Sequence, residues 1–206
     1  MSPPHTPQQR ATPGKEEIAL LAPFERLGPD RITLVATAAQ AEKACDELAA
    51  STVWGFDTES KPTFVQGEVS DGPHVVQLST LDKAWVFQLH DRDCRHLVAQ
   101  LLARPGTTKA GFGLGDDKKR IEAKLGVVPA GVLELNHVFR QQGYRKDMGV
   151  KGAVAVLFNQ RFMKSKKAAT SNWANAQLTE SQLVYAANDA YAAARVYHAL
   201  GLPAGA

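Results

Sequence analysis

Two carboxylates at the end of one apolar segment could hold a metal ion. Asp57 and Glu59 stand two residues apart in the run VWGFDTE, which reads as a β-strand. Residues two apart on a strand project to the same face, so both acids point into one place. Paired carboxylates repel each other and lose hydration unless a cation compensates, which favours a hard divalent ion. The alternative is an exposed strand end whose charges are simply solvated.

A second acidic position lies far downstream on an expected helix. Residues 179–182 read TESQ, a capping-box spacing that predicts a helix start at this point. Tyr185 and Asp189 follow four residues apart, so they share one face of that helix. The alternative is an amphipathic helix with a surface aspartate and a half-buried tyrosine.

A glycine-rich turn carries the remaining candidate acids. Residues 109–117 read KAGFGLGDD, a strand that runs through a turn into a helix near residues 118–125. A dinucleotide-binding GxGxxG motif is excluded because Asp116 occupies its third glycine position. These acids either complement the helix dipole or add a third carboxylate to the others. The register against Gly111 and Gly113 favours Asp117 over Asp116 for the latter role.

The order of the expected elements predicts an α/β fold. Strands are expected at residues 32–36, 53–57, 74–79, 84–89 and 109–112, with helices between and after them. Short links make the second, third and fourth strands antiparallel neighbours, so the sheet is mixed, five-stranded and flanked by helices. We expect a flexible, proline-rich tail over residues 1–20 and a single domain over residues 21–206.

Composition limits the class of protein. The chain has 206 residues, of which 44% are hydrophobic and 22% charged, as in a globular protein with a buried core. No apolar run reaches the roughly 18 residues that cross a bilayer, and the N-terminus lacks a secretory layout. The sequence therefore predicts a cytoplasmic protein that binds no membrane. The net charge of +3 permits a nucleic-acid partner without requiring one.

Positive charge is concentrated in one stretch. Residues 140–167 contain eight lysines or arginines and one acid, which suits contact with a phosphate backbone. Trp173 follows as a stacking or a packing residue. A solvated lysine-rich helix face with Trp173 in the core is the alternative. The residues that we expect to contact nucleic acid are Arg145, Lys151, Arg161, Lys164, Lys166, Lys167 and Trp173.

Taken together, the three acidic segments resemble the motifs of the DEDD 3′–5′ exonucleases. Residues 56–59 (FDTE) resemble the first motif, Gly111-x-Gly113 followed by Asp117 the second, and Tyr185-x-x-x-Asp189 the third. Tyrosine four residues before the last aspartate is typical of the DEDDy branch, which includes Werner exonuclease-like and ribonuclease D-like domains. The resemblance covers residues 32–200. Lys118 and Lys119 depart from it, because Werner-type members often carry an aromatic residue there.

The resemblance implies a ribonuclease H-like fold and a metal-dependent hydrolase. Asp57, Glu59, Asp117 and Asp189 would hold two Mg²⁺ or Mn²⁺ ions, and Tyr185 would orient the attacking water. The expected activity is 3′–5′ cleavage of single-stranded ends of DNA or RNA to nucleoside 5′-monophosphates. One alternative is a catalytically inactive nucleic-acid-binding protein on the same fold, which would lack at least one acid. Another is an unrelated hydrolase of small phosphoesters, for which the basic stretch would be superfluous.

Overall fold

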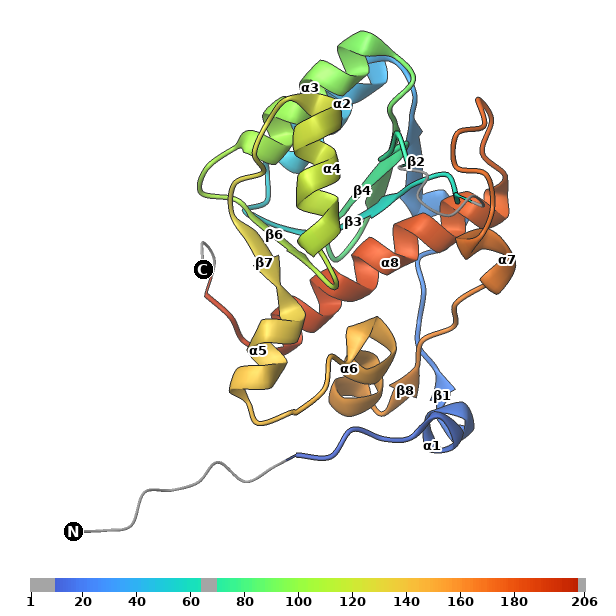
Figure 1. The fold of residues 1–206 in the computed structure, drawn as a ribbon, viewed down its shortest axis with the longest axis vertical. Coiled ribbons are helices and arrows are strands. Elements are labelled where there is room, and N and C mark those ends of the chain that lie inside the picture. Colours follow the sequence, from blue (N-terminus) through green and yellow to red (C-terminus); the bar gives the residue numbers. More distant parts are fainter. Residues whose placement is uncertain (1–9, 64–69, 204–206) are drawn as a thin grey trace, which may run out of the picture.

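A mixed six-stranded sheet forms the centre of the protein (Figure 1), which is seen in a computed structural model describing residues 10–63 and 70–203. The order across the sheet is β2 (Ile32–Val35), β5 (Ala84–Gln88), β4 (Val75–Ser79), β3 (Val53–Glu59), β6 (Thr108–Gly111) and β7 (Val132–Glu134). β4 is antiparallel to both β3 and β5, and the other pairs are parallel. The predicted mixed sheet is confirmed, but the predicted number of five strands is wrong. The missed strand, β7, has three residues at the sheet edge, too few to show an alternating pattern.

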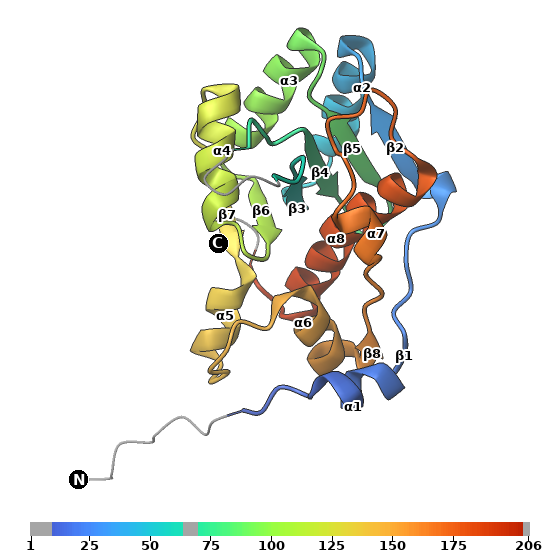
Figure 2. The same cartoon turned by 45° about the vertical axis from the view of Figure 1, so that its right-hand side comes forward.

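Helices cover both faces of this sheet and bury two separate cores (Figures 1 and 2). On one side α2 (Ala38–Leu48), α3 (Arg92–Ala103) and α4 (Gly115–Leu125) enclose a core that includes Trp54 and Phe56. On the other side lie α8 (Glu180–Ala199), α5 (Leu135–Gln141), α6 (Gly149–Phe158) and the single-turn α7 (Lys166–Ala169). Trp173 and Tyr197 are fully buried in this second core. Among the described residues, no helix is both long and apolar enough to cross a membrane.

The N-terminal segment is more structured than the composition suggested. Residues assigned to the tail form α1 (Lys15–Leu20), whose first turn is closed by a hydrogen bond from the Gly14 N–H to the Glu17 carboxylate at 2.5 Å. β1 (Ala22–Pro23) then pairs in parallel with β8 (Gln160–Arg161), and the 3₁₀ turn η1 (Pro29–Arg31) leads into β2. The proline-rich composition ends at Pro13, and the following KEEIAL run favours a helix. Residues 1–9 of the expected tail lie outside the described residues.

α8 begins where the capping-box spacing predicts. The Thr179 hydroxyl accepts from the Gln182 N–H at 3.3 Å, and the Gln182 side-chain oxygen accepts from the Thr179 N–H at 3.0 Å. Two N–H groups that helix geometry leaves without partners are thereby satisfied. This fixes the start of α8, and with it the turns that carry Tyr185 and Asp189.

The backbone of α8 lies in direct contact with the backbone of β3 at Gly55. A β-carbon on Gly55 would fall 1.8 Å from the Ala190 carbonyl oxygen and 2.7 Å from the Ala194 nitrogen. Such distances are far below van der Waals contact, so only glycine fits at this position. The alanines along α8 have small side chains that also allow close approach. The contact between Gly55 and Ala190 sets the distance between strand and helix.

We expect Gly55→Ala to destabilise the protein by about 2–3 kcal/mol, because the added methyl group forces α8 away from β3. Urea denaturation measures this free energy of unfolding. Gly115→Ala is the matched control, since nothing lies within 4 Å of its added β-carbon and its φ is not positive. A Gly55→Ala variant as stable as Gly115→Ala would show that the contact does not constrain the helix.

Candidate active site

The end of β3 delivers two carboxylates to the face that α8 covers. Gly55, Asp57 and Glu59 are spaced two residues apart, so they lie on the same face of the strand. Gly55 is the residue that touches α8. Asp189 enters from α8, where it is 4% exposed. One oxygen from each of Asp57, Glu59 and Asp189 lies within 4.8 Å of the other two. The structure thus brings the three predicted carboxylates into one cluster. The alternative, in which Asp57 and Glu59 are solvated at an exposed strand end, does not describe this arrangement.

Lys164 supplies a positive charge to this cluster. Its ammonium group forms a 2.7 Å ion pair with the Asp189 carboxylate and lies 5.4 Å from the centre of the Tyr185 ring. Tyr185 in turn packs against Trp173, with ring centres 6.0 Å apart. The phenol is therefore held between an indole and an ammonium group, one helical turn before Asp189.

Asp117 lies beside the cluster rather than in it. Its carboxylate accepts a hydrogen bond from the Thr58 hydroxyl, on the β3 residue between Asp57 and Glu59. Its charge contributes to raising the pKa of Asp57, so the two are electrostatic neighbours. The competing acid Asp116 has a side chain 80% exposed and pairs with Lys119 at 3.8 Å. The geometry favours Asp117, and the helix register explains why only one of two adjacent acids turns inward.

Glu134 holds the turn that aims Asp117. One of its carboxylate oxygens accepts from the Leu114 N–H at 2.8 Å and the other from the Asn136 N–H at 3.0 Å. It stands at the end of β7, the strand that the sequence analysis missed, so its role was also missed. Thr58 was quoted only as part of a motif, without a role of its own.

Burial raises the pKa values of all four acids, and repulsion within the cluster adds to this at Asp57 and Glu59. Desolvation raises the pKa of Glu59 to about 9, and the neighbouring charges of Asp57 and Asp189 push in the same direction. Desolvation is also the largest cause for Asp57, Asp117 and Asp189, although Lys164 opposes it at Asp189. Without a divalent ion the cluster therefore holds protons at neutral pH, and a bound cation would replace them.

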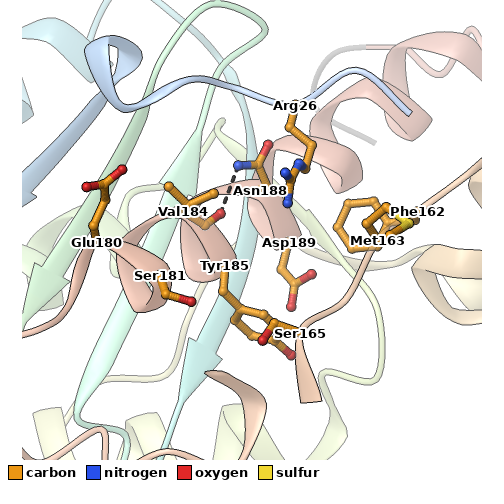
Figure 3. A pocket seen from close by; sticks show the side chains of 10 residues that line it. All are labelled: Arg26, Phe162, Met163, Ser165, Glu180, Ser181, Val184, Tyr185, Asn188 and Asp189. Carbon is orange, nitrogen blue, oxygen red and sulfur yellow. Dashed lines mark hydrogen bonds between the residues drawn. The ribbon is translucent and has the colours of Figure 1, made fainter. Parts of the chain in front are cut away.

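The carboxylate cluster borders two hollows. One, of about 450 Å³, is lined by Asp57, Phe112, Met148, Lys164 and Asp189 among others. The second, of about 400 Å³, lies on the tyrosine side (Figure 3). There Tyr185 and Asp189 project from successive turns of α8 toward the chain that carries Ser165, with Phe162 and Met163 beyond Asp189. A substrate in either hollow would therefore meet the acids directly.

The predicted nucleic-acid contacts fall into different environments. Arg145, Lys151, Lys166 and Lys167 are exposed, Arg161 is partly buried, and Lys164 belongs to the acid cluster itself. Trp173 is 0% exposed, so the prediction that it contacts nucleic acid is wrong. Its indole packs under α8 against Tyr185, which is the packing alternative.

Gln77 is an unusual neighbour of the site. It pairs with Asp57 across the β3–β4 ladder, so its side chain enters the same α8-covered face. It is 0% exposed, and among the described residues neither its amide oxygen nor its amide nitrogen has a hydrogen-bond partner. Gln88 on β5, only 2% exposed, instead donates to the carbonyl oxygens of Asn175 and Ala176. A glutamine inside the otherwise apolar run VVQL was the available sequence signal for Gln77.

The fold and site together define an α/β protein with a carboxylate site suited to divalent ions, on the ribonuclease H-like fold that the motifs implied. A family model described as 3′–5′ exonuclease matches residues 32–203. The chain belongs to this 3′–5′ exonuclease family, whose members are hydrolases.

Individual relatives agree with this assignment. The chain is 30% identical over 157 residues to the mouse bifunctional 3′–5′ exonuclease/ATP-dependent helicase WRN, a match covering 75% of this chain and 11% of the mouse protein. It is 26% identical over 149 residues to a 3′–5′ exonuclease of Arabidopsis thaliana, covering 71% of this chain and 51% of the plant protein. The chain thus spans only a part of these relatives.

Solved structures share the fold at lower sequence identity. The exonuclease domain of Aedes aegypti Nibbler superposes with a TM-score of 0.73 at 20% identity, covering 86% of this chain and 90% of that one. Ribonuclease D of Trypanosoma brucei, solved in complex with the RNA U12, gives 0.72 at 21% identity, with coverages of 82% and 62%. These two likenesses concern the fold.

Rising pH is expected to lower the thermal stability of the metal-free protein between pH 6.5 and 8. The pKa of Glu59 is about 9 in the folded state and about 4.3 in an unfolded chain. Between these values the unfolded state binds fewer protons, so the free energy of unfolding falls as pH rises. His74 and Lys109 act oppositely because their folded pKa values are lowered, but mainly below pH 6.5 and above pH 8.

Differential scanning calorimetry in EDTA measures this dependence. Glu59→Gln, which cannot titrate, should give a smaller fall in Tm over the same interval. A wild-type Tm that stays constant or rises would contradict the predicted protonation of the cluster.

The two buried glutamines predict opposite responses to one substitution. We expect Gln77→Met to raise the free energy of unfolding by about 1–2 kcal/mol, because it removes polar atoms that lack partners. Gln88→Met should lower it by about 1–2 kcal/mol, because it removes the hydrogen bonds that this buried amide donates to the carbonyl oxygens of Asn175 and Ala176. Urea denaturation in EDTA compares them, and a loss of stability in both variants would mean that the Gln77 amide is satisfied.

Proposed function

We propose that the chain is a DEDDy-type 3′–5′ exonuclease that removes nucleoside 5′-monophosphates from single-stranded ends of DNA or RNA. The observation that carries this proposal is the meeting of Asp57, Glu59 and Asp189 within 4.8 Å, with Tyr185 one turn before Asp189. Separate segments of the chain supply these residues, in the order that the family motifs require. In the reaction, water attacks the terminal phosphodiester, the P–O3′ bond breaks, and the 3′ oxygen leaves with a proton.

The donor set fits Mg²⁺ or Mn²⁺. All of the candidate ligands are carboxylate oxygens, which hard divalent cations prefer over nitrogen or sulfur. Asp57, Glu59 and Asp189 would hold one ion, while Asp57 and the more distant Asp117 would hold a second. Such ions, when bound, activate the attacking water and stabilise charge on the leaving oxygen.

Tyr185 acts as a neutral hydroxyl rather than as a base. Burial is the main cause that raises the pKa of Tyr185 above its ordinary value near 10, so the phenol keeps its proton at neutral pH. A protonated phenol can donate one hydrogen bond and accept another, which is what orienting a water molecule requires. The packing against Trp173 fixes the ring in place for this task.

Lys164 restrains Asp189 before any ion arrives. Its charge is the largest influence that opposes the rise in the pKa of Asp189 on desolvation, and its side chain is 30% exposed. It lines the hollow that contains Asp57, so it is also placed to contact a substrate phosphate there. The same side chain thus serves the acids and the anionic substrate.

The inactive alternative receives no support from the described residues. It requires that at least one acid be missing, whereas all four are present: three meet, and the fourth is held beside them by Thr58.

We expect 5′-labelled single-stranded DNA or RNA to be shortened from its 3′ end in Mg²⁺ or Mn²⁺, and to remain intact in EDTA. Asp57→Asn should abolish cleavage while leaving binding largely intact. Tyr185→Phe should slow cleavage by about 100-fold, the usual cost of losing the orientation of a reacting group. Gel electrophoresis at single-nucleotide resolution measures the ladder. Turnover retained in Asp57→Asn would refute the proposed mechanism, and binding without any ladder would favour the inactive alternative.

A further inference from the structure

The N-terminal segment forms a strap that is attached to the body at both ends. At residue 10, the Arg10 N–H donates to the Gly143 carbonyl at 3.2 Å, and the guanidinium group lies 5.8 Å from the centre of the Tyr144 ring. In the last turn of α1, the Ala19 carbonyl accepts from the Arg161 side chain at 2.8 Å, and β1 then pairs with β8. Residues 12–19 therefore span a defined path between two anchors. This strap precedes residue 32, where the match to the exonuclease family begins.

The strap, α6 and β8 enclose a groove of about 790 Å³. Its apolar lining includes Ile18, Met148, Phe162 and Met163, of which Met163 is 49% exposed. Lys15, Lys146, Lys151 and Arg161 also line it, against the single acid Asp147. Asp147 is already paired with Arg140 at 2.7 Å. The groove thus combines apolar surface, against which bases can pack, with a clear excess of positive charge that attracts a phosphate backbone.

The groove adjoins both hollows of the active site. It shares Asp147 and Met148 with the hollow that contains Asp57, and Phe162 and Met163 with the hollow that contains Tyr185. Lys151 on its wall lies close enough to Asp189 to lower the pKa of that carboxyl group. A strand that leaves the acids can therefore enter the groove directly.

The balance of charged side chains distinguishes this groove from the other hollows near the acids. The hollow on the Tyr185 side has one cation, Arg26, against Glu180 and Asp189. A further hollow near α4 has Lys118 and Arg140 against three acids, Asp116, Glu134 and Asp147. Among the described hollows that adjoin the site, the groove under the strap is the one that attracts a polyanion.

We propose that this groove binds the single-stranded substrate 5′ of the nucleotide being removed, with phosphates on Lys15 and Lys146 and bases against Ile18 and Met163. The inference rests on the proposed exonuclease function, because a strand whose 3′ end lies at the acids can extend only in the 5′ direction. It adds a substrate subsite formed by residues outside the family-matched segment.

The test is the salt dependence of binding, measured by fluorescence anisotropy in EDTA with 12-nucleotide oligothymidylate and oligouridylate. Each phosphate contact on a single strand contributes about 0.7 to the slope of log Kd against log salt concentration. The double variant Lys15→Ala/Lys146→Ala should reduce this slope by about 1.4 and weaken binding. Both lysines are exposed, so the variant should fold. Cleavage of a dinucleotide, which is too short to reach the groove, should keep the wild-type kcat/KM.

A matched control removes two exposed charges elsewhere. Lys43→Ala/Arg92→Ala lies on α2 and α3, which cover the opposite face of the sheet, and should leave the slope unchanged. A slope unchanged in Lys15→Ala/Lys146→Ala, or reduced equally in the control, would overturn the inference. Equal losses on the dinucleotide and the 12-nucleotide strands would also overturn it. If the wild-type protein cleaves neither substrate, the proposed function itself fails, which is a distinguishable outcome.

Discussion

Repulsion among carboxylates that are buried or partly buried is the interaction around which this protein is organised. Asp57, Glu59 and Asp189 meet in a place where water cannot fully solvate them, with Asp117 close by and Lys164 as the nearby counter-charge. A fold that only had to be stable would not collect these groups, because each adds a desolvation cost to the next. The cost is understandable if the acids serve to bind cations, since a divalent ion converts the repulsion into attraction. The arrangement of these acids in the folded chain therefore favours the binding of a divalent cation.

The packing of α8 against β3 is what makes this concentration of charge possible. Gly55 and the alanines of α8 bring the two backbones together, so acids on separate elements come within reach of one another. Specific polar contacts fix the elements on the two faces of the sheet, including the capping box of α8 and the Glu134 carboxylate at the turn before α4. Apolar packing sets the distances, and these few hydrogen bonds set the directions of the side chains.

The sequence predicted the parts of the site that follow from local periodicity. Spacings of two on a strand and four on a helix placed Asp57 with Glu59 and Tyr185 with Asp189, and the capping signal located α8. Contacts between distant segments were not accessible in the same way. Nothing in the local pattern distinguishes Lys164, which joins the acids, from Lys166 and Lys167, which face solvent.

Two further features could not be predicted from the sequence: the short strand β7 and the burial of Trp173. β7 was too brief to show a period, and the role of Glu134 was lost with it. For Trp173, composition could not separate stacking on a base from packing in the core, because an indole suits both. The structure separates them, since no part of this side chain reaches the surface.

Asn188, the residue just before Asp189, connects α8 to the part of the chain that precedes the family-matched segment. Its side-chain oxygen accepts from the Leu27 N–H at 2.8 Å, and its amide nitrogen donates to the Leu27 carbonyl at 3.2 Å. Leu27 and nearby Phe24 are themselves buried in the core beneath α8. The segment that matches the family begins at residue 32, whereas the segment that packs as one unit also includes Phe24 and Leu27. A fragment cut at residue 32 would keep every acid of the cluster but lose the two hydrogen bonds between Leu27 and Asn188, the residue next to Asp189.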